Sequence, residues 1–213
     1  MPLQNRVAPD GSLHSRSERG MFTGNRGVIH DPGTRALSGR RWTTKAWICC
    51  VLDHRGRKRD VWGRNFNGRN GPAAGWSELF FCDEVTALAA GHRPCFACRR
   101  DDASRFLAAS GIANANSADI ALHGERWLSS QQAPQRLSPI DLPGLPDGTM
   151  VRAGERFHAI RGRKALAWDF GGYQEPVGFG ELLRHPMVLV TPRSVIAALR
   201  AGYKPAWHET AMT

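Results

Sequence analysis

Two cysteines near the middle of the chain stand three positions apart, in the segment Arg93-Pro-Cys-Phe-Ala-Cys-Arg99. A turn between cysteines at this spacing can direct both thiols to one side, where they can bind one metal ion. A structural zinc ion takes four ligands in a tetrahedral array, mainly cysteine sulfur and histidine nitrogen. Cys95 and Cys98 would supply two of them, and the adjacent arginines would favour the thiolate form. The alternative is that both cysteines pack as small apolar side chains.

The residues before this pair predict the elements that position it. A Phe-Phe pair suits a strand, and Asp83 is placed to cap a helix over residues 84–90. Gly91 fits the position of positive φ just past that helix. Pro94 keeps the chain extended as it enters the cysteine pair. We therefore expect a strand, a short helix, a tight turn, the two cysteines and a second helix over residues 99–110.

The run from Ala89 to Arg99, Ala-Ala-Gly-His-Arg-Pro-Cys-Phe-Ala-Cys-Arg, resembles the second half of the metal-binding module of the Ada family of bacterial DNA-repair proteins. A related module is appended to some nucleases, and there it begins with a Gly-Asn strand that runs into a histidine. Residues 24–30, Gly-Asn-Arg-Gly-Val-Ile-His, are similar to that beginning. The resemblance implies that His30 is a third zinc ligand and that the protein acts on DNA.

The chain departs from that pattern at the fourth ligand. The nuclease-linked modules have a cysteine four residues after the histidine, and this chain has Thr34 there. The candidates to complete the site are Cys50, Cys82, His54 and Asp31. We favour Cys50, because a strand over residues 45–53 beside the site would turn Cys50 toward it and Cys49 away. If no protein group completes the set, a water molecule would occupy the fourth position, as in catalytic zinc sites.

A second chemical pattern is the His-x-Glu of Leu122-His-Gly-Glu-Arg126. Together with Pro-Cys-x-x-Cys it makes up the two parts of the zinc deaminase signature, in which the glutamate moves protons, but here the parts come in reverse order. His123 and Glu125 could serve as catalytic acid and base of a deaminase or of a nuclease-like site. The alternative is a solvent-facing helix on which Glu125 lies near Arg126.

The net charge of +10 at pH 7 is concentrated in the first half of the chain. Residues 1–110 hold 18 Lys and Arg against 10 Asp and Glu, and residues 111–213 hold 11 against 9. Aromatic residues are interleaved with the basic runs, a composition typical of surfaces that bind nucleic acid through phosphates and stacked bases. A basic composition without function is the alternative. The predicted nucleic-acid contacts are Arg40, Arg41, Lys45, Arg55, Arg57, Lys58, Arg59, Arg93, Arg99 and Arg100.

Composition predicts a folded protein built from short elements. Of the 213 residues, 41% are hydrophobic, while 23 Gly and 13 Pro argue against a helical bundle. The chain has no apolar run of 18 residues and no signal-peptide pattern, so we expect no membrane association. Five cysteines, an odd number, favour thiols on a metal in a cytoplasmic protein over a disulfide framework.

We expect an α+β fold in three parts. Residues 1–20 would form a loosely packed arm, and residues 21–130 an Ada-like basic zinc domain with a small antiparallel sheet and helices. Residues 135–213 would form a small antiparallel β module with a C-terminal helix capped by Thr191. The strands expected in this module are 149–152, 156–160, 165–168 and 187–190.

The sequence thus predicts a cytoplasmic bacterial protein that contains zinc, mainly as a structural ion, and binds DNA in repair or processing. In the Ada proteins the methyl-accepting cysteine belongs to the first ligand pair, which has no matching cysteine here, so methyl transfer is not implied. Two alternatives stay open. One is a metal-dependent enzyme that acts on nucleic acid, and the other is a zinc module that binds protein.

Overall fold

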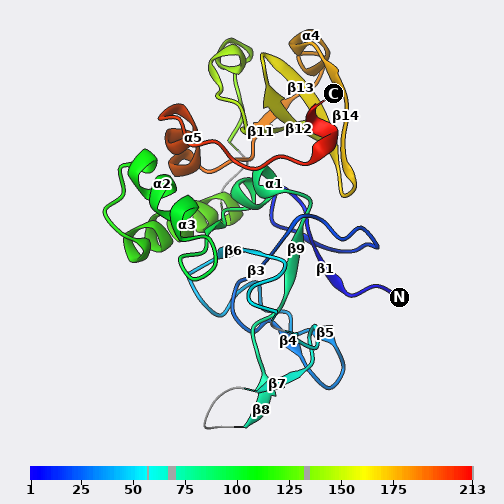
Figure 1. Ribbon diagram of the computed structural model, residues 1–213. Helices are drawn as coiled ribbons and strands as arrows, with labels where there is room; N and C mark the ends of the chain where they lie inside the picture. The colour runs from blue at the N-terminus through cyan, green and yellow to red at the C-terminus, as the bar shows by residue number, and fades with distance from the viewer. Residues whose placement is uncertain (57, 67–70, 132–134, 213) are drawn as a thin grey trace.

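The computed structural model describes residues 1–56, 58–66, 71–131 and 135–212. It has an α+β fold in which one short helix lies between two main sheets and three further helices lie to one side (Figure 1). None of its helices, within the described residues, is long and apolar enough to cross a membrane.

The first sheet has six strands in the order β10-β6-β3-β9-β1-β2. Its strands are β1 (Gln4–Val7), β2 (Leu13–Ser15), β3 (Phe22–Asn25), β6 (Ile48–Val51), β9 (Leu79–Phe81) and β10 (Arg93–Pro94). The inner strand β3 pairs antiparallel with β6 and β9, whereas β10 runs parallel to β6 and β1 parallel to β9. Gly24 makes the β3–β6 contact possible, because a Cβ there would lie 2.1 Å from the carbonyl oxygen of Ile48.

Two hairpins extend beyond this sheet, at the end of the molecule opposite the second sheet (Figure 1). They are β4 (His30–Asp31) with β5 (Ala36–Leu37), and β7 (Arg64–Phe66) with β8 (Pro72–Ala74).

The prediction of a loosely packed arm over residues 1–20 was wrong. β1 and β2 pair as a hairpin at the edge of the first sheet. Asn5 and Val7 both point inward and are 1% exposed, and Val7 packs in the core with Phe22 and Leu79. A strand of four residues offers too few alternating positions for its period to stand out in a polar segment.

The short helix α1 (Glu84–Ala89) lies at the centre of the molecule, and all of its residues are buried. It begins as the sequence predicts, because Asp83 accepts a hydrogen bond from the backbone N–H of Thr86 at 2.8 Å. Gly91 follows the helix with a φ of +78°, as predicted for the position just past its end.

Three helices cover one side of α1. They are α2 (Arg100–Ser110), α3 (Ala115–Gln131) and α5 (Arg193–Arg200). Leu88 of α1 belongs to one apolar cluster with Phe106, Leu122 and Val195 from these three helices. The N-cap of α5 is Pro192 and not the predicted Thr191, whose hydroxyl accepts a hydrogen bond from the N–H of Met150 at 2.7 Å.

The second sheet is antiparallel throughout, in the order β14-β13-β12-β11-β15. Its strands are β11 (Met150–Ala153), β12 (Arg156–Arg161), β13 (Lys164–Asp169), β14 (Gly172–Val177) and β15 (Met187–Leu189). Four correspond to predicted strands, and β14 was not predicted. The remaining elements are α4 (Phe179–Leu182) and the 3-10 helices η2 (Pro139–Gly144) and η3 (Glu209–Met212).

The helix α1 joins the two predicted modules into one packed structure. Its residues Val85 and Ala89 lie in one apolar cluster with Met150, Leu166 and Tyr173 of the second sheet. The segments predicted as separate domains, 21–130 and 135–213, therefore bury α1 from both sides.

Two buried carboxylates at the start of α1 reinforce this junction. Asp83 accepts hydrogen bonds from the Tyr173 hydroxyl at 2.8 Å and from the backbone N–H of His208 at 3.2 Å. Burial raises the pKa of Asp83, and these hydrogen bonds oppose that effect.

Glu84 connects to the same C-terminal segment. One of its oxygens accepts a hydrogen bond from the Tyr203 hydroxyl at 2.6 Å, and the other from the N–H of Ala206 at 2.9 Å. The second oxygen also lies 2.8 Å from Nη2 of Arg99. Both side chains of this ion pair are at most 5% exposed.

His92, directly after the predicted turn, is fully buried. Its ring contacts those of Trp47 and Phe81, with centroids 5.0 and 4.7 Å away. Burial lowers its pKa well below the usual value, and the neighbouring Arg26 and Arg126 lower it further. His92 is therefore neutral in the folded protein at physiological pH.

Glu84→Gln should lower the free energy of unfolding by about 1–3 kcal/mol, because it removes one of the two carboxylates that pair with the buried Arg99 guanidinium and leaves only Asp102. Urea unfolding measures the change. Glu181→Gln is the matched control, since Glu181 pairs with Arg184 on the surface and is 52% exposed; it should cost less than about 0.5 kcal/mol. Equal effects of the two substitutions would contradict a stabilising role for the buried Glu84–Arg99 ion pair.

Stability should fall as pH decreases below about 6.5, because the unfolded chain then binds a proton that folded His92 excludes. The pKa of His92 is lower in the folded than in the unfolded chain. Its contribution to the free energy of unfolding is therefore constant above the unfolded pKa and decreases as the pH falls below it. One such residue lowers the free energy of unfolding by up to about 1.4 kcal/mol for each pH unit. His92→Phe should reduce this slope between pH 6.5 and 5.5. An unchanged slope in His92→Phe would refute the prediction.

Candidate metal centre

Three cysteines from two segments converge at one end of the first sheet. Cys50 lies on β6, and Cys95 and Cys98 lie on the turn between β10 and α2. Their sulfur atoms all lie within 4.8 Å of one another. The strand pairing explains the approach, because Pro94 aligns with Cys49 in the parallel β10–β6 pair. The N–H of Cys95 then donates to the carbonyl of Cys49 at 3.0 Å, which places Cys95 beside Cys50.

Side chains alternate between the two faces of β6, so Cys49 and Cys50 point in opposite directions, as the sequence predicts. Cys49 faces the opposite side of the strand and belongs to the apolar core with Phe22 and Phe81. Burial raises its pKa. Its sulfur lies 3.5 Å from Nη1 of Arg99, which donates to it.

Backbone amides point at the sulfurs of the cysteine pair. Cys95 accepts a hydrogen bond from the N–H of Ala97 at 3.4 Å and another from the N–H of Cys98. Cys98 accepts from the N–H of Val51. Hydrogen bonds of this kind favour the thiolate over the thiol.

The three cysteine side chains are hydrogen-bonded to one another. The Cys50 thiol donates to Cys95 and Cys98, and this hydrogen bond is the main reason that the pKa of Cys95 falls to about 5 and that of Cys98 is lowered. The pKa of Cys50 is raised, first by the same bonds and then by burial. Three cysteine sulfurs this close together, two of them with a lowered pKa, form a site at which a cation can replace the thiol protons.

The geometry and the donor set fit a soft divalent metal ion. Zn–S bonds of about 2.3 Å in a tetrahedron separate neighbouring sulfurs by roughly 3.8 Å. Side-chain adjustments of about 1 Å would therefore close the three sulfurs around an ion. Thiolate ligands select metals such as zinc. Among the residues that the structure describes, no fourth Cys, His, Asp or Glu joins this group.

His30 does not lie with the three cysteines. Its Nδ1 lies 2.6 Å from the Ser77 hydroxyl, and its ring stacks on Trp62 with centroids 5.4 Å apart. The topology explains the separation. β3 runs antiparallel to β6 with Asn25 opposite Ile48, so the chain that leads to His30 passes the start of β6, whereas Cys50 lies near its end.

The other candidates for a fourth ligand also lie outside the cysteine group. Cys82 is buried next to the α1 cap, and burial raises its pKa. The Asp31 side chain stabilises the turn that follows it, because its Oδ1 accepts hydrogen bonds from the N–H groups of Gly33 and Thr34. His54 is half-buried in the turn after β6.

His123 and Glu125 lie on α3 and form no site with the cysteines. Glu125 accepts hydrogen bonds from the backbone N–H and the hydroxyl of Ser194, in the first turn of α5. It therefore ties α3 to α5. The His123 ring contacts that of Trp42 edge-on, with centroids 5.3 Å apart. Burial lowers the pKa of His123.

Three of the predicted nucleic-acid contacts pair with carboxylates of the protein, and two of them, Arg93 and Arg99, are buried. Arg93 forms a buried bidentate pair with Asp119, with two N–O distances of 2.8 Å. Arg99 is buried against Glu84 and Asp102. Arg59 pairs with Glu78 at 2.7 Å and lies over the Trp76 ring. Arg57 lies outside the described residues.

Five of the other predicted contacts are exposed and form two groups at opposite ends of β6. Arg40, Arg41 and Lys45 precede the strand, and Arg55 and Lys58 follow it on the side of the cysteines. The exposed Arg100 begins α2, also beside the cysteines.

A tryptophan near the first basic group contacts two further arginines. The guanidinium carbons of Arg26 and Arg126 each lie 4.0 Å from the centre of the Trp47 ring. Burial lowers the pKa of Arg26 to about 9, and its neighbours Arg41 and Arg126 add to this effect. The region around the start of β6 is thus strongly cationic.

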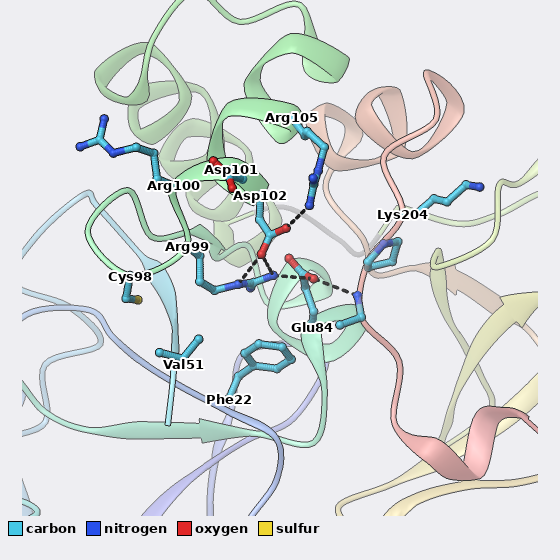
Figure 2. Close-up of a pocket in the computed structure, with 12 residues that line it drawn as sticks. Phe22, Val51, Glu84, Cys98, Arg99, Arg100, Asp101, Asp102, Arg105 and Lys204 are labelled. Carbon is cyan, nitrogen blue, oxygen red and sulfur yellow. Dashed lines mark hydrogen bonds and ion pairs between the residues drawn. The ribbon is translucent and has the colours of Figure 1, made fainter. Parts of the chain in front are cut away.

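Sequence reasoning did not find a pocket of about 530 Å³ next to Cys98 (Figure 2). Its walls come from the first sheet, the first turn of α2 and residues 204–206. Lys204 and Cys98 are more than 100 residues apart, and no local pattern in the sequence signals their proximity.

Comparisons with protein-family models, with curated proteins and with solved structures find no match to this chain.

Proposed function

We propose that this protein is a zinc-containing DNA-binding protein that acts in DNA repair or processing, with zinc as a mainly structural ion. The observation that carries the proposal is the convergence of Cys50 with Cys95 and Cys98, with backbone amides directed at their sulfurs. A zinc ion there would link β6 to the turn before α2 and hold two basic segments in place. These segments carry Arg55 and Arg100.

Charge and exposed cations support a nucleic-acid partner. The chain has a net charge of +10, and its exposed Arg and Lys flank β6 on both sides. Phosphate neutralisation by such residues supplies most of the affinity of non-specific DNA binding. The half-buried Trp42, next to Arg41, adds an aromatic ring to the first basic group. Resemblance of residues 89–99 to the Ada module favours DNA over RNA.

One observation favours a second candidate, a metal-dependent enzyme that acts on nucleic acid. The three-thiol group lacks a fourth protein ligand within the described residues, and a pocket opens beside Cys98. A metal ion with an exchangeable position next to a pocket is the usual arrangement of a catalytic site. In this case His123 and Glu125 would not be the catalytic pair, because Glu125 is bonded to Ser194.

Purified protein should contain about one zinc ion per chain, and Cys95→Ser should lose it, because two thiolates bind zinc far less tightly than three. Elemental analysis measures the metal. Cys82→Ala is the matched control, since Cys82 is also a buried cysteine but lies outside the cluster. Well-folded wild-type protein that takes up no zinc would refute the metal proposal.

DNA affinity should fall with increasing salt, and neutralising two phosphate-contacting residues should reduce the slope of log K against log salt by up to about 1.8. We expect this for Arg40→Gln/Arg41→Gln and for Arg55→Gln/Lys58→Gln. The control is Arg156→Gln/Lys164→Gln, which removes the same charge from two exposed positions on the second sheet. A salt-independent affinity, or a slope that changes equally in all three variants, would count against the proposed interface.

A further inference from the structure

The pocket beside Cys98 has the size of a small-ligand site. Its volume of about 530 Å³ lies within the range usual for such sites. One side is apolar, with Phe22 and Val51 from the sheet and Pro205 and Ala206 from the C-terminal segment. The other side is the charged first turn of α2 (Figure 2).

The floor of the pocket is a fixed ion-pair network. Arg99 lies between Glu84 and Asp102, at 2.8 Å from each, and Asp102 also pairs with Arg105. Glu84 is further held by Tyr203 and Ala206. Because these groups satisfy one another, they shape the pocket and leave little charge for a ligand.

The remaining charges are unequal. Two exposed cations of the lining, Arg100 and Lys204, make no ion pair among the described residues, and Asp101 is the one carboxylate of the lining outside this network. In Figure 2 Arg100 and Lys204 lie on opposite sides of the pocket with their charged ends pointing away from each other, and both residues are exposed. Both side chains are long and flexible, so they can turn over a ligand that enters between them.

We propose that this pocket binds a phosphate monoester. Such a group carries about −1.5 to −2 charges at pH 7 and three terminal oxygens, so Arg100 and Lys204 can each bind a different oxygen. A phosphodiester offers only two terminal oxygens and a single negative charge, so it gains less from two separate cations. The sugar or base attached to the phosphate would pack on the apolar side formed by Phe22 and Pro205. The ligand is thus the phosphorylated end of a nucleic-acid strand or a free nucleotide.

The test measures binding of two matched pairs of probes by fluorescence anisotropy or calorimetry. The first pair is one single-stranded oligonucleotide with and without a terminal phosphate, at the 5′ or 3′ end. The second is deoxyadenosine monophosphate and deoxyadenosine. The wild-type protein should prefer the phosphorylated member of at least one pair by about tenfold. Preference within the first pair identifies a strand end, and preference within the second alone identifies a nucleotide.

Arg100→Gln/Lys204→Gln should abolish the preference, and the control Arg156→Gln/Lys164→Gln should keep it. All four residues are exposed, so the variants should fold and keep their metal content. The proposal is overturned if the wild-type protein shows no preference in either pair, or if Arg100→Gln/Lys204→Gln retains it. The nucleotide pair requires no DNA binding, so this result is distinct from a failure of the proposed DNA-binding function.

Discussion

The structure depends on two adjacent carboxylates buried at the start of α1. A buried carboxylate is costly unless hydrogen bonds or cations compensate it. Here the compensation comes from segments far away in the sequence. Asp83 binds Tyr173 and the backbone of His208, and Glu84 binds Tyr203, the backbone of Ala206 and Arg99. The apolar faces of α1 bring the sheets and helices together, and the two acids fix where the C-terminal segment lies against them.

The same network reaches the candidate metal centre. Arg99 directly follows Cys98 and also donates to the sulfur of Cys49. The residue that neutralises Glu84 therefore also orients the turn that carries two of the three thiols. The second half of the chain thus contributes to the metal centre without supplying a ligand, because its residues Tyr203 and Ala206 hold Glu84 in place.

Local patterns in the sequence predicted local structure well. The Asp83 cap, the glycine after α1, the helix α2 and most strands of the second sheet all appear where the spacing of residues indicates them. The alternation of Cys49 and Cys50 also follows from local geometry, once β6 is recognised as a strand. Each of these features depends on residues fewer than ten positions apart.

Features that depend on strand order could not be predicted in this way. Whether His30 or Cys50 joins the cysteine pair depends on which strands are neighbours and on their direction, and neither is encoded in a local pattern. The same limit applies to the arginines. Arg93 and Arg99 look like phosphate contacts beside the cysteines, but their partners Asp119 and Glu84 are brought to them by tertiary packing. Burial of a charge becomes visible only when the distant counter-charge is known.

The long connection between the two parts of the metal centre has a consequence for how this chain tolerates change. Residues 51–94, which include the β7–β8 hairpin, separate Cys50 from Cys95. The entropy of closing a flexible loop grows slowly with its length, by only about 0.6 kcal/mol for each doubling. The hairpin extends away from the sheet, so its length could change with little effect on the position of the thiols. Insertions and deletions at this hairpin would leave the cysteine geometry intact, whereas a one-residue shift between β6 and β10 would destroy it.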